Sequence, residues 1–403
     1  MPEISFNEAL AMTVGSILPL PAEDVPIGKL TGRVAASPVA SLIDTPSVDI
    51  SLKDGYAVIS SDIAGASPAC PVQLRLTGSR MAGSSEIIRV VPGTTVRIMS
   101  GAAIPDGADA VVAEEFTACD NGTVSVSAPS ARGRNILEKG TDAAIGDLLV
   151  EKGSRLSPSQ IGLLAAAGHE KIPVYRSPRV GIVATGDEVV AVGRKIRDGM
   201  VFASNLVTIA SWCSIYGMSS KQRVVNDSAT AIRRAISDVL RTADCLITSG
   251  GAWKGERDRV VQILDDMGWE KTFHRVRMGP GKAIGFGHLA SKPVFCLPGG
   301  PPSNQMAFLQ LALPGLLKLG GHTICGLPVA HAIITEAVQG QKDWTQFIYG
   351  SLRQTRDGLE FRPLKLSSRL QFMARADAIV MIAEGCEKLE KGSRVPVQLV
   401  SRC

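Results

Sequence analysis

Residues Asp244 to Asp258 read Asp-Cys-Leu-Ile-Thr-Ser-Gly-Gly-Ala-Trp-Lys-Gly-Glu-Arg-Asp, and this stretch decides the fold class. An apolar run ends in a serine–glycine turn, and a charged segment with helical periodicity follows, so the order predicts strand, tight turn and helix. Such a turn exposes backbone N–H groups beside a helix N-terminus, where an anion is stabilised. Glu256 and Asp258 would repel that anion unless a cation lay between them. The stretch therefore indicates a phosphate-bearing ligand held with a divalent metal.

Strand and helix patterns alternate on both sides of this stretch, from residue 178 to about residue 320. We expect strands at 179–184, 245–247 and 292–297, and helices at 203–216, 229–242, 258–267 and 304–317, the last broken at Pro314. Alternation of this kind predicts a doubly wound, mainly parallel sheet.

The remaining segments differ in pattern. A helix is expected at 3–15, and another at 158–167 with Ser157 as its N-cap. Short apolar runs cut by turn residues predict a β-rich region, with strands at 72–76, 87–91, 95–99 and 110–112. The C-terminal part returns to short strands, at 332–335, 346–349, 378–382 and 394–400. The chain therefore combines α/β and β domains.

The amino-acid composition limits the functional classes to which the protein can belong. The 403 residues are too many for one simple core, so two to four domains are expected. Aromatic residues make up only 4% of the chain, which argues against a protein that stacks nucleic-acid bases. The net charge of +5 is mild and fits an anionic small ligand.

The cysteines and the N-terminus favour a cytoplasmic protein. The eight cysteines are scattered and form no CxxC pair, which argues against a zinc or redox motif and fits a reducing compartment. No signal peptide is visible, and no apolar run is long enough to span a membrane. We expect neither a nucleic-acid partner nor a membrane partner.

Three of the expected strands end in unusual turns, and the carboxyl ends of strands are where α/β sheets bind ligands. The turns are 185–188, reading Thr-Gly-Asp-Glu, the serine–glycine turn 248–251, and 297–304, reading Leu-Pro-Gly-Gly-Pro-Pro-Ser-Asn. A single turn of this kind is most simply an ordinary connection, because glycine and aspartate are common in turns. Three turns from one sheet, two with paired acids, favour a binding site.

Other polar residues allow two interpretations. Asp227 is most simply an N-cap for the helix that follows it. Lys282 follows Gly-Pro-Gly, where backbone and ammonium can both approach an anion, but it also fits a solvated loop. In the β-rich region, Asp54, Ser100 and Asp142 each lie in polar turns that would individually pass for hairpin loops.

Together these segments resemble the molybdopterin molybdenumtransferase family, of the MoeA and gephyrin E-domain type. The resemblance covers nearly the whole chain, with order and spacing in agreement. The segments that carry it are Lys53-Asp-Gly-Tyr-Ala-Val58, the run from Arg97 to Val112, Thr185-Gly-Asp-Glu188, Ser204-Asn205, Thr248-Ser-Gly-Gly251 with Gly255-Glu-Arg-Asp258, Pro280-Gly-Lys282 and Leu297-Pro-Gly299.

The resemblance implies four regions. Residues 1–26 with 147–177 would form an elongated linking domain and 27–146 a β-rich insertion. Residues 178–326 would form the α/β molybdopterin-binding domain and 327–403 a C-terminal β-barrel-like domain. It also implies a homodimer in which the β-rich domain of one subunit faces the α/β domain of the other. Molybdoenzymes or other cofactor-biosynthesis proteins would be its protein partners.

The resemblance also implies an activity in molybdenum cofactor biosynthesis. The family inserts molybdate into adenylylated molybdopterin and cleaves the adenylate with Mg²⁺ or another divalent cation, releasing AMP. By resemblance, Asp227 and Asp258 would hold the cation, and Asp54, Asp142, Glu188 and Asp258 would be catalytic. The residues expected to bind the ligand are Ser100, Thr185, Gly186, Asp187, Ser249, Gly250, Gly251, Gly255, Glu256, Lys282, Pro298, Gly299, Pro301, Ser367 and Ser368.

The chain departs from the family pattern at several positions. Gly279 stands where a lysine is usual, Tyr349 where an arginine is expected, and Leu137 where an arginine is common. Losing cations from an oxyanion site should weaken molybdate capture, since each charge-assisted hydrogen bond is worth about 1.5–3 kcal/mol. A divergent, non-catalytic molybdopterin carrier or scaffold is therefore the alternative. An unrelated nucleotide-binding enzyme is disfavoured because no GxGxxG or P-loop motif follows a strand.

Overall fold

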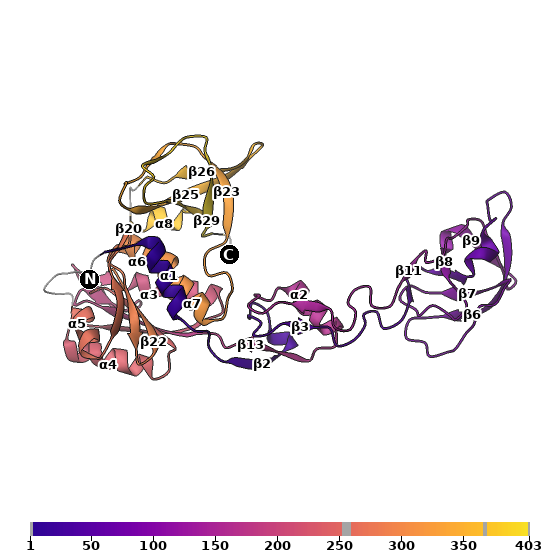
Figure 1. The fold of residues 1–403 in the computed structure, drawn as a ribbon, viewed down its shortest axis with the longest axis horizontal. Helices are drawn as coiled ribbons and strands as arrows, with labels where there is room; N and C mark the ends of the chain where they lie inside the picture. Colours follow the sequence, from indigo (N-terminus) through magenta and orange to yellow (C-terminus); the bar gives the residue numbers. More distant parts are fainter. Residues whose placement is uncertain (1–2, 252–258, 366–368, 402–403) are drawn as a thin grey trace.

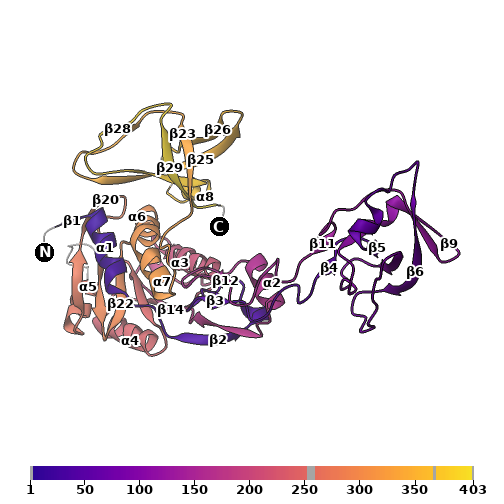
Figure 2. The same cartoon turned by 45° about the vertical axis from the view of Figure 1, so that its right-hand side comes forward.

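The computed structural model describes residues 3–251, 259–365 and 369–401 of the chain. The molecule is elongated (Figure 1, Figure 2). The β-rich domain lies at one end and the α/β domain at the other, with the linking region between them. The C-terminal domain sits against the α/β domain. No helix in the described ranges is both long enough and apolar enough to cross a membrane.

The α/β domain is built on a sheet whose strand order is β17-β14-β18-β22-β21-β19. The first four strands are parallel, and β21 and β19 add an antiparallel edge, so the predicted mainly parallel sheet is confirmed. Its strands are β14 (Arg179–Thr185), β17 (Ser219–Val225), β18 (Cys245–Ser249), β19 (Glu270–His274), β21 (Gly285–Leu289) and β22 (Lys292–Leu297). A small pair, β15 (Val189–Val190) and β16 (Val201–Phe202), lies beside it.

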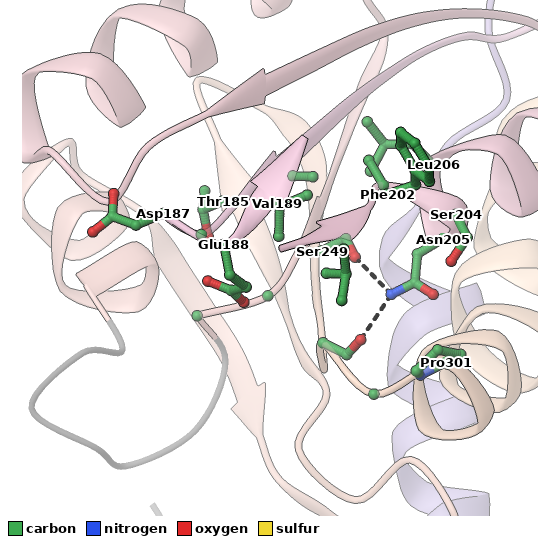
Figure 3. Close-up of a pocket in the computed structure, with 18 of the residues that line it drawn as sticks. Thr185, Asp187, Glu188, Val189, Phe202, Ser204, Asn205, Leu206, Ser249 and Pro301 are labelled. Carbon is green, nitrogen blue, oxygen red and sulfur yellow. Dashed lines mark hydrogen bonds between the residues drawn. The ribbon is translucent and has the colours of Figure 1, made fainter. Parts of the chain in front are cut away.

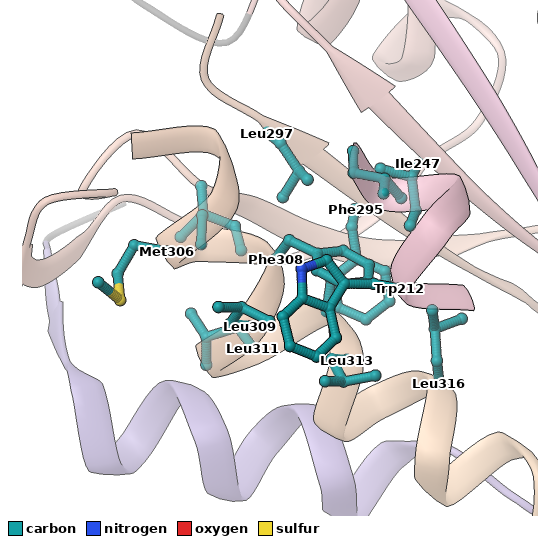
Figure 4. Packing of buried hydrophobic residues seen from close by; sticks show 14 of the residues in the cluster. Trp212, Ile247, Phe295, Leu297, Met306, Phe308, Leu309, Leu311, Leu313 and Leu316 are labelled. Atoms are coloured by element: carbon teal, nitrogen blue, oxygen red, sulfur yellow. The ribbon is translucent and has the colours of Figure 1, made fainter. Parts of the chain in front are cut away.

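Helices cover both faces of this sheet, as a doubly wound fold requires. On one face, α4 (Ala229–Leu240) and α5 (Arg259–Asp266) bury apolar side chains such as Ile236 and Ile263. On the other face, α3 (Ser204–Ile215) and α6 (Pro301–Ala307) pack with α7 (Leu313–Leu319) around Trp212, Phe295 and Phe308 (Figure 4).

The long helix expected at 304–317 is interrupted, as predicted. A π-helical turn, η4 (Phe308–Ala312), separates α6 from α7. Pro314 explains the break, because it has no N–H to donate and its ring would clash with the carbonyl four residues earlier.

The N-terminal helix α1 (Phe6–Ser16) follows the two-residue strand β1 (Ile4–Ser5), and Ser5 caps it. Its buried residues Phe6 and Ala9, with Ile17 after it, pack into the core of the α/β domain. The sequence placed these residues with the linking region, but their side chains complete the α/β core. The predicted domain boundaries otherwise stay a prediction.

The linking region joins short antiparallel pairs of strands that are far apart in the sequence. They are β2 (Ala22–Pro26) with β13 (Lys171–Tyr175) and β3 (Val39–Ala40) with β12 (Leu148–Val150). A third pair, β4 (Ile50–Ser51) with β11 (Ile136–Leu137), lies at the β-rich domain (Figure 1), where Ile136 packs against its core. A short turn, η1 (Ile27–Lys29), lies beside the first pair. Helix α2 (Pro158–Ala166) has the predicted cap, in which Ser157 and Gln160 form a capping box.

A buried ion pair joins this region to the α/β domain. Asp244, only 9% exposed, accepts hydrogen bonds from Arg176 over 2.7 and 2.8 Å and from the side chain of Arg179 over 3.1 and 3.2 Å. Although burial raises the pKa of Asp244, these guanidinium groups hold it well below its ordinary value. The pair therefore fixes the end of β13 against the start of β14.

The β-rich domain is a sheet in the order β8-β5-β7-β6-β10-β9. Its elements are β5 (Gly55–Val58), η2 (Ser60–Ile63), β6 (Val72–Arg80), β7 (Thr94–Ile98), β8 (Ala110–Ala113), η3 (Glu114–Phe116), β9 (Thr117–Asp120) and β10 (Thr123–Val126). The strand predicted at 87–91 is wrong. Only Arg89 makes an isolated bridge there, and Ile87 is 88% exposed, because no neighbouring strand edge extends along this segment.

The C-terminal strands close into a barrel, because β27 pairs with both β29 and β25. The elements are β23 (Val329–Ile334), β24 (Val338–Gln339), β25 (Thr345–Thr355), β26 (Gly358–Pro363), α8 (Gln371–Ala374), β27 (Ala378–Ile382), β28 (Lys388–Leu389) and β29 (Arg394–Leu399). Strand β20 (Val276–Gly279) of the α/β domain pairs with β25 and, on its other edge, with β1. The two domains therefore share backbone hydrogen bonds.

Candidate functional site

A cavity of about 1510 Å³ opens at the carboxyl ends of β14, β18 and β22 (Figure 3). The three turns singled out in the sequence meet there because parallel strands end at the same edge of the sheet. The predicted residues that line this cavity are Thr185, Gly186, Asp187, Glu188, Asp227, Ser249, Gly250, Gly251, Pro298, Gly299 and Pro301.

The hydroxyl of Ser249 lies at the centre of a hydrogen-bond network. It accepts from the side-chain amide of Asn205 over 3.2 Å (Figure 3). It also accepts from the side-chain amide of Asn304 over 3.1 Å. The same two amides donate to the carbonyls of Gly299 and Pro298, over 2.9 and 2.8 Å. A hydroxyl has two acceptor lone pairs and one donor hydrogen, so the Ser249 hydrogen remains available to donate to an anionic ligand.

Gly250 and Gly251 are required by the backbone of the turn. Their φ angles of +96° and +66° lie in the left-handed region. A Cβ on Gly250 would lie 2.8 Å from the carbonyl oxygen of Thr185, and one on Gly251 would lie 2.6 Å from Val260. Thr185 itself is 5% exposed, and its hydroxyl has no hydrogen-bond partner in the described parts of the chain. The turn thus packs tightly against β14 and leaves a buried hydroxyl at the cavity wall.

One side of the cavity is acidic. Asp187, Glu188 and Asp227 line it, and the backbone N–H of Asp227 donates to Asp187 Oδ1 over 3.1 Å. Burial raises the pKa of Asp227, and the negative charges of Asp187 and Glu188 raise it further, while Arg259 acts in the opposite direction. Arg259 also donates to the carbonyl oxygen of Asp227 over 3.3 Å. Carboxylates crowded in this way favour a bound cation.

These residues suit a Mg²⁺ ion with few protein ligands. Carboxylate oxygens are the donors that Mg²⁺ prefers, and it is commonly held by one or two carboxylates together with substrate phosphates. Within the described ranges, no three histidine, cysteine, aspartate or glutamate side chains are grouped closely enough to hold a metal ion by themselves. The donor set fits an ion that binds together with a phosphate ligand.

The opposite side of the cavity is apolar. Phe202, which is 41% exposed, lies near Leu206 on this side in Figure 3. Ile196 and Met200 are further apolar residues that line the cavity. The C-terminal domain adds Arg369 at the rim, next to Leu370. A ligand that combines a flat ring with phosphates would find both kinds of surface in one cavity.

A smaller cavity, of about 410 Å³, adjoins the first, and Ala283 and Pro298 line both. The predicted residue Lys282 lies here, together with Gly279, Ser303 and, from the C-terminal domain, Gln346. The sequence placed Lys282 with the phosphate-binding turns, whereas the structure gives it a separate compartment beside them.

Three of the predicted site residues lie at the other end of the molecule. Asp54 accepts a hydrogen bond from the backbone N–H of Ser100 over 2.7 Å, and both belong to the β-rich domain. Asp142 is exposed in the connection between that domain and the linking region. None of the three lines the α/β cavity of the same chain.

Two of the departures from the family pattern lie away from the cavities. Tyr349 is 4% exposed and packs edge-to-face on Phe372 with ring centroids 5.3 Å apart, and burial raises the pKa of its hydroxyl. It is a core residue at the base of the barrel. Leu137 is half-buried in β11.

Five predicted residues, Gly255, Glu256, Asp258, Ser367 and Ser368, lie outside the described residues. Their assigned roles stay predictions. Asn304 was missed as a site residue, and Asn205 was noted only as part of a motif. Their importance comes from two amides on different helices reaching one hydroxyl. The sequence feature that pointed to Asn304 was its place at the end of the 297–304 turn, which was already a candidate part of the site.

Three family models match the chain in order. They are the "MoeA N-terminal region (domain I and II)" over residues 4–168, the "Probable molybdopterin binding domain" over 181–318 and the "MoeA C-terminal region (domain IV)" over 331–400. The chain is 33% identical to a molybdopterin molybdenumtransferase of Haemophilus influenzae over 312 residues, which are 75% of each protein. It is 31% identical to that of Bacillus subtilis, over 91% of this chain and 87% of the relative.

A solved structure of a molybdopterin biosynthesis MoeA protein from Pyrococcus horikoshii superposes with a TM-score of 0.82 at 32% identity, covering 99% of both chains. Sequence models, curated relatives and solved structure thus agree over most of the chain. The chain belongs to the molybdopterin molybdenumtransferase (MoeA) family.

Proposed function

We propose that the chain inserts molybdate into adenylylated molybdopterin and cleaves the adenylate, releasing AMP. Family membership supports the transferase activity in molybdenum cofactor biosynthesis. The insertion of molybdate and the cleavage of the adenylate are supported by the kinds of residue that line the large cavity. Acidic side chains, a free serine O–H and an apolar wall meet at one sheet edge, beside a smaller cavity with a lysine.

The serine–glycine turn binds the phosphates in this proposal. Ser249 donates its O–H to a phosphate oxygen, while Asn205 and Asn304 hold its oxygen in place. Donors that are fixed before the ligand arrives stabilise developing charge without further reorganisation. The flat rings of the ligand bind against the apolar wall around Phe202.

Asp227 and Asp258 hold the divalent cation, and Asp187 and Glu188 line its surroundings. When bound, Mg²⁺ neutralises the charge on the phosphoanhydride that separates the AMP moiety from molybdopterin. Asp227 is suited to this role because its neighbours make its own negative charge unfavourable when no cation is present.

Lys282 binds the molybdate oxyanion in the smaller cavity. Molybdate is a tetrahedral dianion, for which an ammonium group and neutral N–H or O–H donors are suitable partners. Ser303, Gln341 and Gln346 provide neutral donors around this cavity. Ser367 and Ser368 are further candidates.

The second subunit of a homodimer completes the site in this proposal. Asp54, Ser100 and Asp142 have roles only if they reach the cavity of another copy, because within one chain they lie at the far end of an elongated molecule (Figure 1). The elongated shape and the polar turns at its β-rich end support this arrangement.

The experiment that tests the proposal follows both products. Purified protein is incubated with adenylylated molybdopterin, Mg²⁺ and molybdate, and AMP and protein-bound molybdenum are measured. The proposal predicts release of AMP with incorporation of molybdenum, and loss of both in Asp258→Asn. Binding of the ligand without either product would select the carrier or scaffold. That alternative is favoured by the few cations of the smaller cavity, where Lys282 is the one lysine or arginine among the described residues that line it.

A further inference from the structure

The turn that carries Lys282 is held by the C-terminal domain. In the register of β20 with β25, Met278 lies opposite Thr345 and Gly279 opposite Gln346. The strand that leads directly into Pro280-Gly281-Lys282 therefore joins the sheet of the barrel, between β25 and β1 (Figure 1).

An ion pair adds to this attachment. Arg277, on the same strand, donates to Glu384 of the C-terminal domain over 3.0 Å and to the backbone carbonyl of Glu3 over 2.9 Å. The N-terminus, the α/β domain and the barrel thus meet beside the lysine turn.

The backbone of the turn is closely packed. The N–H of Val276 donates to the carbonyl of Lys282 over 3.0 Å. Gly281 has a φ of +114°, and a Cβ there would lie 3.2 Å from the backbone nitrogen of Ala307 in α6. The Cα of Lys282 is therefore fixed, while its exposed side chain retains several rotatable bonds.

The side chain of Lys282 contacts the ring of Trp344. Its Nζ atom lies 5.5 Å from the centre of the Trp344 ring, within the range of a cation–π contact. Trp344 is half-buried, and its backbone N–H donates to the carbonyl of Gln341 over 3.2 Å in the tight turn before β25. A rigid aromatic ring on one domain thus faces the ammonium group of the other.

Both residues line the smaller cavity. Lys282 is the one lysine or arginine among the residues that line it, as far as the chain is described. The position of this single cation therefore has a large effect on how an oxyanion is held there. An aromatic face attracts an ammonium group and restricts the rotamers of its long side chain.

We propose that Trp344 is a positioning residue, which holds the Lys282 ammonium group in the smaller cavity for the incoming oxyanion. This inference rests on the proposed function, in which Lys282 binds molybdate. The C-terminal domain then contributes to the site in this chain, because the barrel supplies both strand β25, which pairs with β20, and the ring of Trp344.

The test compares Trp344→Leu with Trp344→Phe, which keeps an aromatic face. Trp344→Leu should raise the KM for molybdate by about threefold to tenfold, with a smaller effect on kcat, and Trp344→Phe should restore most of the affinity. Melting curves check that both variants are folded. An unchanged KM in Trp344→Leu, or equal impairment in the two variants, would overturn the proposal.

A double-mutant cycle with Lys282→Met tests whether the ring acts through the lysine. Trp344→Leu should add little to the KM in the Lys282→Met background, because the group that it positions has already been removed. Full additivity of the two changes would contradict the proposal.

Calorimetric titration with molybdate alone repeats the cycle without turnover. If the wild-type protein releases no AMP, the proposed function fails, but coupling between Trp344 and Lys282 in molybdate binding still supports the positioning role. If the wild-type protein binds molybdate and the cycle formed with the two single variants and the double variant shows no coupling, only the role of Trp344 fails. Absence of molybdate binding by the wild-type protein would overturn both.

Discussion

The side-chain amide of Asn304, on α6, donates a hydrogen bond of 3.1 Å to the hydroxyl of Ser249 at the end of β18. Asn304 is 1% exposed, and the same amide nitrogen donates to the carbonyl of Pro298 over 2.8 Å. A single buried side chain thus joins two of the three turns that form the large cavity. The orientation of the Ser249 hydroxyl depends on it.

Asn304→Asp should disrupt this junction, because a carboxylate cannot donate to either oxygen. The Pro298 carbonyl would lose the Asn304 donor, and the Ser249 hydroxyl would keep only the bond from Asn205. Loss of the two buried bonds should lower the free energy of unfolding by about 1–3 kcal/mol, measured in urea. Binding of AMP, measured by calorimetry, should weaken as well.

Asn226→Asp is the matched control for stability. Asn226 lines the same cavity but is exposed, and its Oδ1 atom accepts from the N–H of Ser228 over 3.4 Å, which a carboxylate can also do. Its free energy of unfolding should change by less than about 0.5 kcal/mol. Equal stability of the two variants would show that the Asn304 bonds are unimportant.

Gly250→Ala should damage the turn that we propose to bind the phosphates. The φ of +96° and the carbonyl of Thr185, 2.8 Å from an added Cβ, both oppose a side chain here. We expect a loss of about 1–3 kcal/mol in the free energy of unfolding, together with weaker AMP binding.

Gly300→Ala is the control for this change, since it lies in the same cavity wall. Its φ is −68°, and no atom lies within 4 Å of an added Cβ. Stability and AMP binding should remain near wild type. If Gly250→Ala behaves like Gly300→Ala, the close packing of the turn against β14 is not required.

Binding of Mg²⁺ should depend on pH through Asp227. The pKa of this carboxyl is raised in the folded protein by burial and by Asp187 and Glu188. In the unfolded chain Asp227 therefore ionises at lower pH than in the folded protein. The ionised carboxylate begins to destabilise the metal-free protein as the pH rises above the unfolded pKa. This destabilisation reaches its full size above the folded pKa. The cation requires the ionised form, so its affinity should rise with pH across the same range.

Asp227→Asn checks this sign. It should raise the Tm of the metal-free protein at neutral pH and remove most of the pH dependence of Mg²⁺ affinity, followed by calorimetry in parallel with the wild-type protein. A lower Tm for metal-free Asp227→Asn, or an unchanged pH profile, would mean that Asp227 is not the titrating ligand.

Gly279→Lys should strengthen molybdate binding. Gly279 lines the smaller cavity, its φ lies outside the left-handed region, and no atom lies within 4 Å of an added Cβ. A second ammonium group could form a charge-assisted hydrogen bond worth about 1.5–3 kcal/mol, which corresponds to roughly a tenfold or larger fall in the KM for molybdate.

Gly279→Met separates charge from bulk, because it adds an unbranched side chain without a cation. It should leave the KM unchanged or raise it. If the methionine and lysine variants behave alike, the smaller cavity does not bind the oxyanion.

The cavity at the sheet edge could be predicted from sequence because its determinants are local. Each of the turns at Thr185, Ser249 and Pro298 follows a recognisable buried strand, and parallel strands bring such turns together. Alternation of strands and helices also indicated the sheet itself.

Other features depend on contacts between distant segments, which periodicity does not report. Tyr349 aligned with a site position, but its ring packs in the core against Phe372. The pattern at Ile87 was typical of a strand, yet no strand edge pairs along it. Lys282 lies in its own cavity because β20 joins the barrel, a pairing between residues that are far apart in the sequence.

In the proposed homodimer, each catalytic site combines the α/β cavity of one subunit with the β-rich end of its partner. Asp54→Asn and Asp227→Asn are expected to be inactive separately. The two variants are co-expressed with different tags, doubly purified to confirm mixed dimers, and assayed for AMP release. The doubly purified mixed dimers should release AMP at about half the wild-type rate, because each holds one intact site and one site that carries both changes. Confirmed mixed dimers that release no AMP would contradict the claim.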